Sequence, residues 1–352
     1  MTASERVKFT IKVVISHILY ALGLLQLWQS ITLKRRAVIL MYHRVLTLEE
    51  RARSGSHPAI MVDRETFSEQ MAVVKRRFKV LSLEEFADRM SRKIPFDDSS
   101  CLITFDDGWT DNFTNALPIL RKYELPAVVF LPVNFIGRNR LFWQEALVHL
   151  LVLAVMTARK DPARETRLRD LIDPIGLGEI FDVCHDDPRP HVIEATSKNR
   201  KGLTPSVVEA TLKKLRIELR VENGDSTGID SFMNWEQVDT MSRQGIEFGG
   251  HGAEHRLLSQ MPIAEAREDI QLSKEVIDLR LKCGTPTFSY PRGYWNPEVA
   301  GLVKASGFRL AFLAQGRSVS CDDNPFALQR INICQAATES MPMFLARVVG
   351  LF

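Results

Sequence analysis

Cysteine is scarce in this chain, with five residues among 352. The five are Cys101, Cys184, Cys283, Cys321 and Cys334, and no two of them have CxxC spacing. An odd, dispersed set is typical of reduced thiols packed as small apolar side chains. We therefore expect neither a disulfide scaffold nor a cysteine-ligated zinc site.

Charge of one sign is also lacking, because the formal net charge is only +3. There is no basic stripe interleaved with aromatic residues, so nucleic acid is not an expected partner. Low-complexity tracts and internal repeats are absent, and 45% of the residues are apolar. This composition is typical of a globular protein, and the length suffices for an α/β barrel with an insertion or for two modest domains.

A long uninterrupted hydrophobic run is missing as well. The most apolar stretch, residues 9 to 33, contains Lys12, His17, Gln26 and Gln29, so its uninterrupted core is shorter than a membrane-spanning helix needs. We expect residues 1–36 to form an apolar, membrane-associated helix at a bilayer surface; packing against the barrel wall is the alternative. No small-residue cleavage pattern follows it, and if the helix enters a bilayer, basic residues 34–36 would keep the rest of the chain on the cytoplasmic face.

The rest of the chain is organised around a short apolar run that ends at two carboxylates. Residues 102–105 are typical of a buried strand, and Asp106, Asp107 and Gly108 follow directly. Consecutive residues on an extended backbone point to opposite sides, so one aspartate can bind a metal while the other acts as a base. An ordinary Asp-Asp-Gly turn is the competing interpretation.

A histidine pair far downstream favours the functional interpretation. His251 and His255 are four residues apart, after the strand-like run 246–249. The two imidazoles can bind one cation if the residues between them form one helical turn. Together with one aspartate they would make a two-histidine, one-carboxylate site with open positions for water and substrate.

Apolar strands alternate with helices on both sides of a less regular middle region. The pattern predicts strands near 38–41, 102–105, 127–131, 246–249, 287–290, 308–312 and 328–333, with helices at 63–78, 235–243 and after Pro262. Between 141 and 234 we expect a helical insertion that includes an amphipathic helix begun by Thr204 and ended by Asn223-Gly224. Residues 145–156 are apolar on nearly all sides, which predicts a buried or a membrane-contacting helix. The predicted domains are 1–36, 37–140, 141–234 and 235–352.

The ordered motifs 39–45 (ILMYHRV), 104–108 (TFDDG), 251–255 (HGAEH) and 288–293 (FSYPRG) resemble those of the polysaccharide deacetylases, carbohydrate esterase family four. The resemblance runs from about residue 37 to 333 and implies a distorted, seven-stranded (β/α)7 barrel. It also implies that Asp107, His251 and His255 bind a divalent metal and that Asp106 is the general base. His43 is our candidate general acid, because no histidine follows His255 to supply the usual C-terminal one.

Other positions depart from the family pattern. The arginine that usually pairs with the catalytic aspartate is Ser289 here, and Arg330 could replace it. The hydroxyl residue that usually follows the first histidine is Gly252, a change that could weaken metal affinity without removing a ligand. Arg292 replaces a tyrosine, yet its backbone N–H could still stabilise an oxyanion beside Pro291. Tyr290, Tyr294 and Trp295 could stack on sugar rings or pack in the barrel.

These features predict a metal-dependent hydrolase that removes acetyl groups from N-acetylated sugars of a polysaccharide or lipid-linked saccharide, in exopolysaccharide or cell-envelope synthesis. Zinc is the favoured metal for nitrogen and oxygen ligands; cobalt, nickel and manganese are alternatives. An O-acetyl esterase or deformylase using the same site is a second hypothesis. A catalytically silent carbohydrate-binding protein is the third. Nothing in the chain predicts its oligomeric state.

Overall fold

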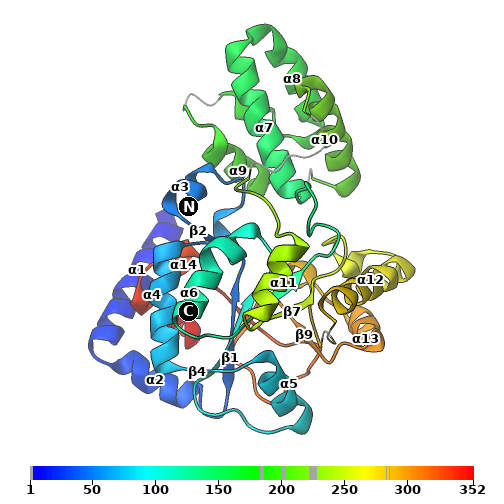
Figure 1. Cartoon of the computed structure of the whole chain (residues 1–352). Helices are drawn as coiled ribbons and strands as arrows, with labels where there is room; N and C mark the ends of the chain where they lie inside the picture. The colour runs from blue at the N-terminus through cyan, green and yellow to red at the C-terminus, as the bar shows by residue number, and fades with distance from the viewer. Residues whose placement is uncertain (1–2, 183–185, 200–202, 222–227, 283, 285) are drawn as a thin grey trace. The chain divides into compact units, whose positions relative to one another are not determined.

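The structure is a computed structural model that describes residues 3–182, 186–199, 203–221, 228–282, 284 and 286–352 (Figure 1). Two compact units make up the chain. The first contains Met1–Arg51, Pro58–Gly137 and Phe232–Phe352, and the second contains Ala52–His57 and Arg138–Ser231.

A curled parallel sheet forms the centre of the first unit, with strand order β10-β1-β5-β6-β7-β8-β9 and with β4 beside β5. The strands are β1 Ala37–Tyr42, β4 Lys79–Val80, β5 Ser100–Phe105, β6 Ala127–Leu131, β7 Ile246–Gly250, β8 Thr287–Ser289, β9 Leu310–Phe312 and β10 Ile331–Asn332. Near β9 the chain also pairs with the segment before β10, where Leu313 N donates to Leu328 O at 2.8 Å. The predicted seven-stranded barrel class is confirmed, and the two-residue strand β4 is an addition to it.

Helices cover the outside of this sheet in the first unit (Figure 1). They are α4 Arg64–Arg77, α5 Leu83–Arg92, α6 Leu117–Lys122, α11 Trp235–Arg243, α12 Ile263–Leu281, α13 Pro297–Ala305, α14 Gln335–Thr338 and α15 Met341–Val348. A short parallel pair, β2 Arg44–Leu46 and β3 Met61–Asp63, lies outside the main sheet, and α3 Leu48–Arg53 connects the two strands together with the loop after it. Phe86, Phe130 and Phe312 are fully buried in one apolar cluster with residues of β1 and β5. This core fixes the strand ends that carry polar residues.

The predicted N-terminal helix is two helices, α1 Ala3–Ala21 and α2 Leu24–Thr32. Gly23 lies between them with φ of +71°, a conformation that glycine adopts without steric cost. The helix axes are bent by 92°. Among the described residues no single helix is long and apolar enough to cross a membrane; only this bent pair passes such a test when its halves are taken together.

The second unit is helical, with α7 Trp143–Lys160, α8 Glu165–Ile172, α9 Arg189–Lys198 and α10 Pro205–Leu219. Helix α7 is largely buried, which favours the core interpretation of residues 145–156. Thr204 is the N-cap of α10 but makes no side-chain capping bond, and Asn223-Gly224 lies outside the described residues.

A buried carboxylate ties the short segment Ala52–His57 to the rest of this unit. Asp230 is fully buried and accepts hydrogen bonds from Ser54 Oγ at 2.7 Å and Gly55 N at 2.6 Å. Its second oxygen also lies 2.8 Å from His149 Nε2. One carboxylate therefore satisfies three polar groups from two separate parts of the sequence.

Cys101, Cys321 and Cys334 are buried free thiols, as their scattered positions predict. Burial raises the pKa of Cys101, which keeps it protonated. Cys184 and Cys283 lie outside the described residues.

Candidate active site

The polar residues singled out in the sequence lie at the carboxyl ends of neighbouring parallel strands. Tyr42 of β1 is in register with Phe105 of β5, so His43 and Asp106 follow the two strands at the same level. Leu131 of β6 is in register with Gly250 of β7, which places His251 at the same edge. Carboxyl ends of parallel strands are where barrel enzymes assemble their catalytic groups.

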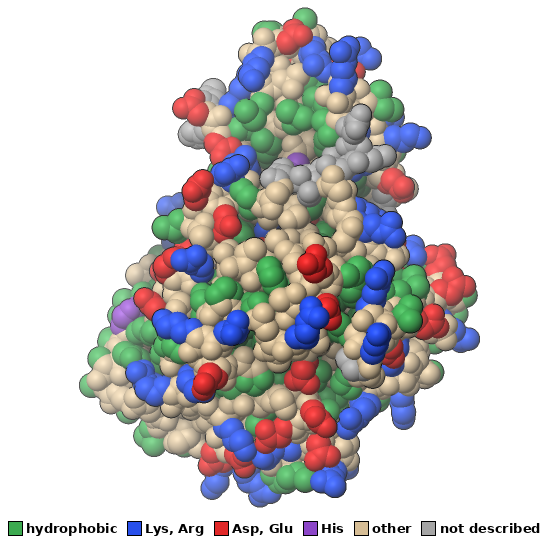
Figure 2. Space-filling model, viewed as in Figure 1, with side chains coloured by type: hydrophobic (Ala, Val, Ile, Leu, Met, Phe, Trp, Pro, Cys, Tyr) green, Lys and Arg blue, Asp and Glu red, His purple; other side chains and the backbone are tan. Residues whose placement is uncertain are grey.

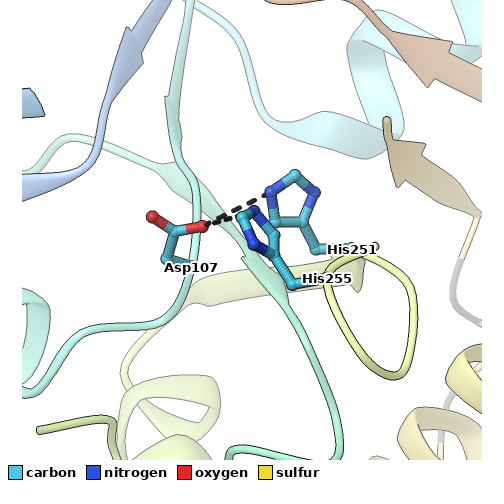
Figure 3. Close-up of side chains that lie close together, drawn as sticks. All are labelled: Asp107, His251 and His255. Atoms are coloured by element: carbon cyan, nitrogen blue, oxygen red, sulfur yellow. Dashed lines mark ion pairs between the residues drawn. The ribbon is translucent and has the colours of Figure 1, made fainter. Parts of the chain in front are cut away.

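Asp107, His251 and His255 form a group that can hold a metal ion (Figure 3). One potential ligand atom of each residue lies within 4.8 Å of the others. Asp107 Oδ1 is 3.5 Å from His251 Nε2 and 3.3 Å from His255 Nε2. This Oδ1 atom of Asp107 is buried and has no hydrogen-bond partner in the described part of the chain. Buried carboxylate oxygens are rarely left unpaired, so this donor set fits a divalent cation.

Backbone geometry and an indole orient Asp107. Asp107 and Gly108 both have positive φ, +75° and +67°, which turns the chain sharply at the end of β5. A Cβ at position 108 would lie 2.7 Å from the Leu131 side chain, so the turn needs glycine there. Trp109 Nε1 donates to Asp107 Oδ2 at 3.0 Å. The indole thereby holds one carboxylate oxygen, and the other faces the histidines.

Trp109 is itself held by two contacts to its ring, a feature that the sequence analysis missed. Phe232 stacks on it with ring centroids 4.4 Å apart, and the Arg44 guanidinium lies 4.3 Å from its ring centroid. Arg44 is fully buried and donates to Asp111 at 2.9 Å. The available signal was an arginine after His43 and an aspartate four residues after Asp107.

The two histidines converge through a tight loop and not through a helical turn, so that part of the prediction is wrong. Gly252 has φ of +72° and His255 has φ of +52°, values outside the right-handed helical region. Leu131 O accepts from His251 N at 3.0 Å, and Gly252 and Ala253 carbonyls accept from the segment after β6. The loop therefore packs on the neighbouring strand end.

Asp269 of α12 holds the same loop from the other side. It is 6% exposed, and its two oxygens accept from Ala253 N at 2.7 Å and Glu254 N at 3.0 Å. A Cβ at Gly252 would lie 2.7 Å from Asp269 Oδ1. The glycine therefore permits the close approach of this carboxylate, and its selection has a structural reason besides the missing hydroxyl.

Arg330 forms the closest charge contact in the site. This fully buried residue precedes β10, and its Nη1 and Nη2 donate to the two oxygens of Asp106 at 2.8 and 2.6 Å. Nη2 also donates to Ser289 Oγ at 2.8 Å. Arg330 thus supplies beside Asp106 the positive charge that Ser289 cannot supply.

Burial and neighbouring charges set the charge states of these groups. Burial raises the pKa of Asp106, but the charge and hydrogen bonds of Arg330 together with the charges of His251 and His43 outweigh it, so the pKa is lowered. The pKa of Asp107 is also lowered, because its contact with His251 and the charges of His255 and His43 outweigh the effect of burial. Burial lowers the pKa of His255 to about 3. For His251, burial lowers the pKa but the charge of Asp106 and contact with Asp107 raise it above its ordinary value. Both carboxylates are therefore ionised at neutral pH.

His43 faces the same charged groups. Its pKa is lowered by burial first, and the charges of Asp107 and Asp106 only partly oppose that effect. Nδ1 is buried without a hydrogen-bond partner among the described residues. His43 is therefore a neutral imidazole at neutral pH and can act as an acid only after it takes up a proton.

The remaining predicted residues lie around the loop after β8. The Tyr290 side chain is fully buried in an apolar cluster and its hydroxyl donates to Phe326 O at 3.0 Å, which favours barrel packing over sugar stacking. Pro291 is buried, while Arg292 is exposed and has φ of +57°. Tyr294 is 54% exposed and Trp295 partly buried against the cluster, so Tyr294 is the more exposed of these two aromatic residues.

Comparison with known proteins finds related sequences and a related fold. The profile of the family described as Polysaccharide deacetylase matches residues 93–161 and 203–311, just over half of the chain. YxkH of Bacillus subtilis (strain 168), assigned to the polysaccharide deacetylases, is 19% identical over 296 residues, 84% of this chain and 70% of that protein. A poly-beta-1,6-N-acetyl-D-glucosamine N-deacetylase of Staphylococcus aureus (strain MSSA476) is 22% identical over 263 residues. That match spans 75% of this chain and 64% of the staphylococcal enzyme.

A solved structure has the same fold. The Streptococcus pyogenes deacetylase PplD, determined in complex with acetate, superimposes with a TM-score of 0.56 at 18% identity. The superposition covers 89% of this chain and 98% of PplD.

Proposed function

This chain belongs to the polysaccharide deacetylase family, a family of hydrolases, and from that premise we propose that it removes acetyl groups from N-acetylated sugars in a metal-dependent reaction. The observation that carries the proposal is the pairing of two adjacent carboxylates with different partners. Asp107 faces His251 and His255, whereas Asp106 is held by Arg330. One carboxylate is thereby suited to bind a cation and the other to accept a proton.

Asp107, His251 and His255 would hold the cation, and we propose zinc because the ligands are two nitrogens and one oxygen. When bound, a divalent cation supplies positive charge that polarises an acyl carbonyl and acidifies a water molecule. The protein contributes fixed ligand geometry, through the Trp109 hydrogen bond to Asp107 and the Asp269 bonds to the histidine loop.

Asp106 is the proposed general base. Its two oxygens accept from Arg330, which keeps the carboxylate ionised and fixes its orientation before a water is deprotonated. His43, near the same charges, would take up a proton and deliver it to the leaving amine. The backbone N–H of Arg292, beside Pro291, is the proposed donor to the developing oxyanion.

The proposed substrate is an acetylated polysaccharide or lipid-linked saccharide of the cell envelope or exopolysaccharide. A relative named for poly-beta-1,6-N-acetyl-D-glucosamine supports a trial with that polymer. The exposed Tyr294 ring, in the loop after β8, would provide a stacking face for a sugar.

The test is a measurement of metal content and acetate release on wild type, Asp106→Asn and Asp107→Ala, with β-1,6-linked N-acetylglucosamine oligomers. We expect wild type to hold about one zinc per chain and to release acetate. Asp106→Asn should keep the metal and lose turnover, and Asp107→Ala should lose both. Exposed Asp322→Asn is the matched control and should behave as wild type.

Two results would overturn the proposal. Full turnover after chelation would show that the reaction does not need a metal. Retained metal in Asp107→Ala would show that Asp107 is not a ligand. Assays on acetate esters and formylated sugars run beside the oligomers distinguish deacetylation from the esterase and deformylase alternatives. Saccharide binding without turnover in a zinc-loaded sample would instead support the silent binding protein.

A further inference from the structure

The first two helices carry a concentration of exposed apolar side chains (Figure 2, left edge). Eleven of the twenty-one exposed large hydrophobic residues in the described chain fall between residues 7 and 31. They are Val7, Ile11, Val14, Ile15, Ile18, Tyr20, Leu22, Leu24, Leu27, Trp28 and Ile31, each between 37% and 66% exposed. Scattered apolar residues are normal on a protein surface, but a contiguous cluster of this kind marks an interaction site.

The cluster follows helical periodicity on both helices. Val7, Ile11, Val14 and Ile18 recur at intervals of four, three and four residues in α1. In α2 the exposed residues Leu24, Leu27, Trp28 and Ile31 lie at positions i, i+3, i+4 and i+7, which also share one helix face. Each set therefore forms one stripe along its helix.

The opposite faces of the two helices are already occupied within the first unit. Helix α1 packs against α15, and Ser16 is 1% exposed. In α2, Leu25 and Gln29 are buried, and Gln29 Nε2 donates to Ser99 Oγ at 3.0 Å. The exposed stripes are therefore apolar surface in addition to the faces that pack against the rest of the first unit.

The local charge indicates which partner this surface fits. No Asp or Glu occurs between Arg6 and Leu48. Lys8 and Lys12 on α1, and Lys34 and Arg35 after α2, are exposed. Basic residues beside an apolar face complement the anionic headgroups of a bilayer. Two copies of the chain joined through this face would instead bring like charges together.

We propose that α1 and α2 form an in-plane anchor that binds the surface of a bilayer containing anionic lipid. The 92° bend at Gly23 prevents the two helices from acting as one straight span. Neither helix alone is long and apolar enough to cross a bilayer. Both stripes can enter the headgroup region while the helices stay parallel to it, with the Trp28 indole at the interface. The argument uses nothing from the active site, so it stands apart from the proposed reaction.

The test is flotation of the full chain with vesicles of phosphatidylcholine, with and without phosphatidylglycerol. Wild type should float with the anionic vesicles and much less with the neutral ones. The double substitution Leu27→Glu and Ile31→Glu should lower the partition coefficient by at least about tenfold. Its control is Leu272→Glu with Leu279→Glu, two exposed leucines of α12 that should leave binding unchanged.

Three further measurements keep the result interpretable. Circular dichroism and metal content of the Leu27/Ile31 variant should match wild type, which separates lost binding from lost folding. Lipids brominated near the headgroup should quench the fluorescence of Trp28, and Trp28→Phe should remove that component. Light scattering should give the same mass for wild type and variant without lipid.

Several outcomes would overturn the proposal. They are equal flotation of wild type and the Leu27/Ile31 variant, equal binding to neutral and anionic vesicles, and quenching of Trp28 only by lipids brominated at the bilayer centre. A wild-type dimer that this variant converts to a monomer would assign the surface to a second copy of the chain.

Discussion

Substitution of Gly252 by serine is expected to weaken both folding and metal binding, although related deacetylases commonly carry a hydroxyl residue after the first histidine. If the missing hydroxyl were the important difference, serine would improve the metal site. The structure predicts the opposite result, because the backbone at position 252 has φ of +72° and the space for a side chain is already filled.

The size of the effect follows from two costs and one gain. A residue with a Cβ in the left-handed region costs about 1–2 kcal/mol. The new Cβ would lie 2.7 Å from Asp269 Oδ1, so that carboxylate must move away from Ala253 N or Glu254 N, at about 1–3 kcal/mol for a weakened charged hydrogen bond. Replacing glycine restricts the unfolded chain and returns roughly 0.4–1 kcal/mol. The net loss in the free energy of unfolding is therefore about 1–5 kcal/mol.

Gly245→Ser is the matched control, because Gly245 also has positive φ, +87°, but no atom within 4 Å of its would-be Cβ. Gly245→Ser should lower the free energy of unfolding by only about 0–1.5 kcal/mol, because only the backbone conformation opposes the new side chain. Urea unfolding measures both variants, and calorimetric zinc titration should show about 10- to 100-fold weaker binding for Gly252→Ser only. Equal unfolding free energies of the two variants, or tighter zinc binding by Gly252→Ser, would refute the reasoning.

Three other substitutions test separate contacts. Arg330→Met leaves Asp106 buried without its partner, so urea unfolding should show a loss of about 3–5 kcal/mol and acetate release should cease; unchanged stability would contradict the ion pair. Trp109→Phe removes the indole N–H from Asp107, and zinc titration should show about tenfold weaker binding; an unchanged Kd would show that the bond does not orient the ligand. Asp230→Ala removes the acceptor of three polar contacts in the second unit, so thermal unfolding should reveal a loss of about 2–3 kcal/mol, whereas altered zinc affinity would contradict a role confined to this unit.

The strands of the barrel were predictable because most of them are short runs of apolar residues. Residues 102–105 and 127–131 are fully buried, so burial on both faces gave a continuous apolar signal in place of alternation. Strand β4 contains two residues that are half exposed, and it escaped prediction because so short a segment has no periodicity. The prediction of a single N-terminal helix was wrong, because a lone glycine inside an apolar run does not reveal a 92° bend.

The site was predictable in its residues more than in its geometry. The spacing of His251 and His255 suggested convergence, but the φ angles of the loop depend on contacts from α12 and β6 that no local pattern shows. Asp269 could not be found for the same reason, because its function depends on a loop fifteen residues away. The indole bond from Trp109 to Asp107 was likewise invisible, although the two residues are only two positions apart.

The position of Arg330 has a consequence for how the protein is made. The candidate metal ligands are complete once residue 255 has been synthesised, whereas the partner of Asp106 arrives beside β10, near the end of the chain. The contacts that hold the two histidines, from Asp269 and Ser289, also precede Arg330 in the sequence. A chain truncated before Arg330 would therefore keep its candidate metal ligands and their supports but lack the cation that orients the proposed base.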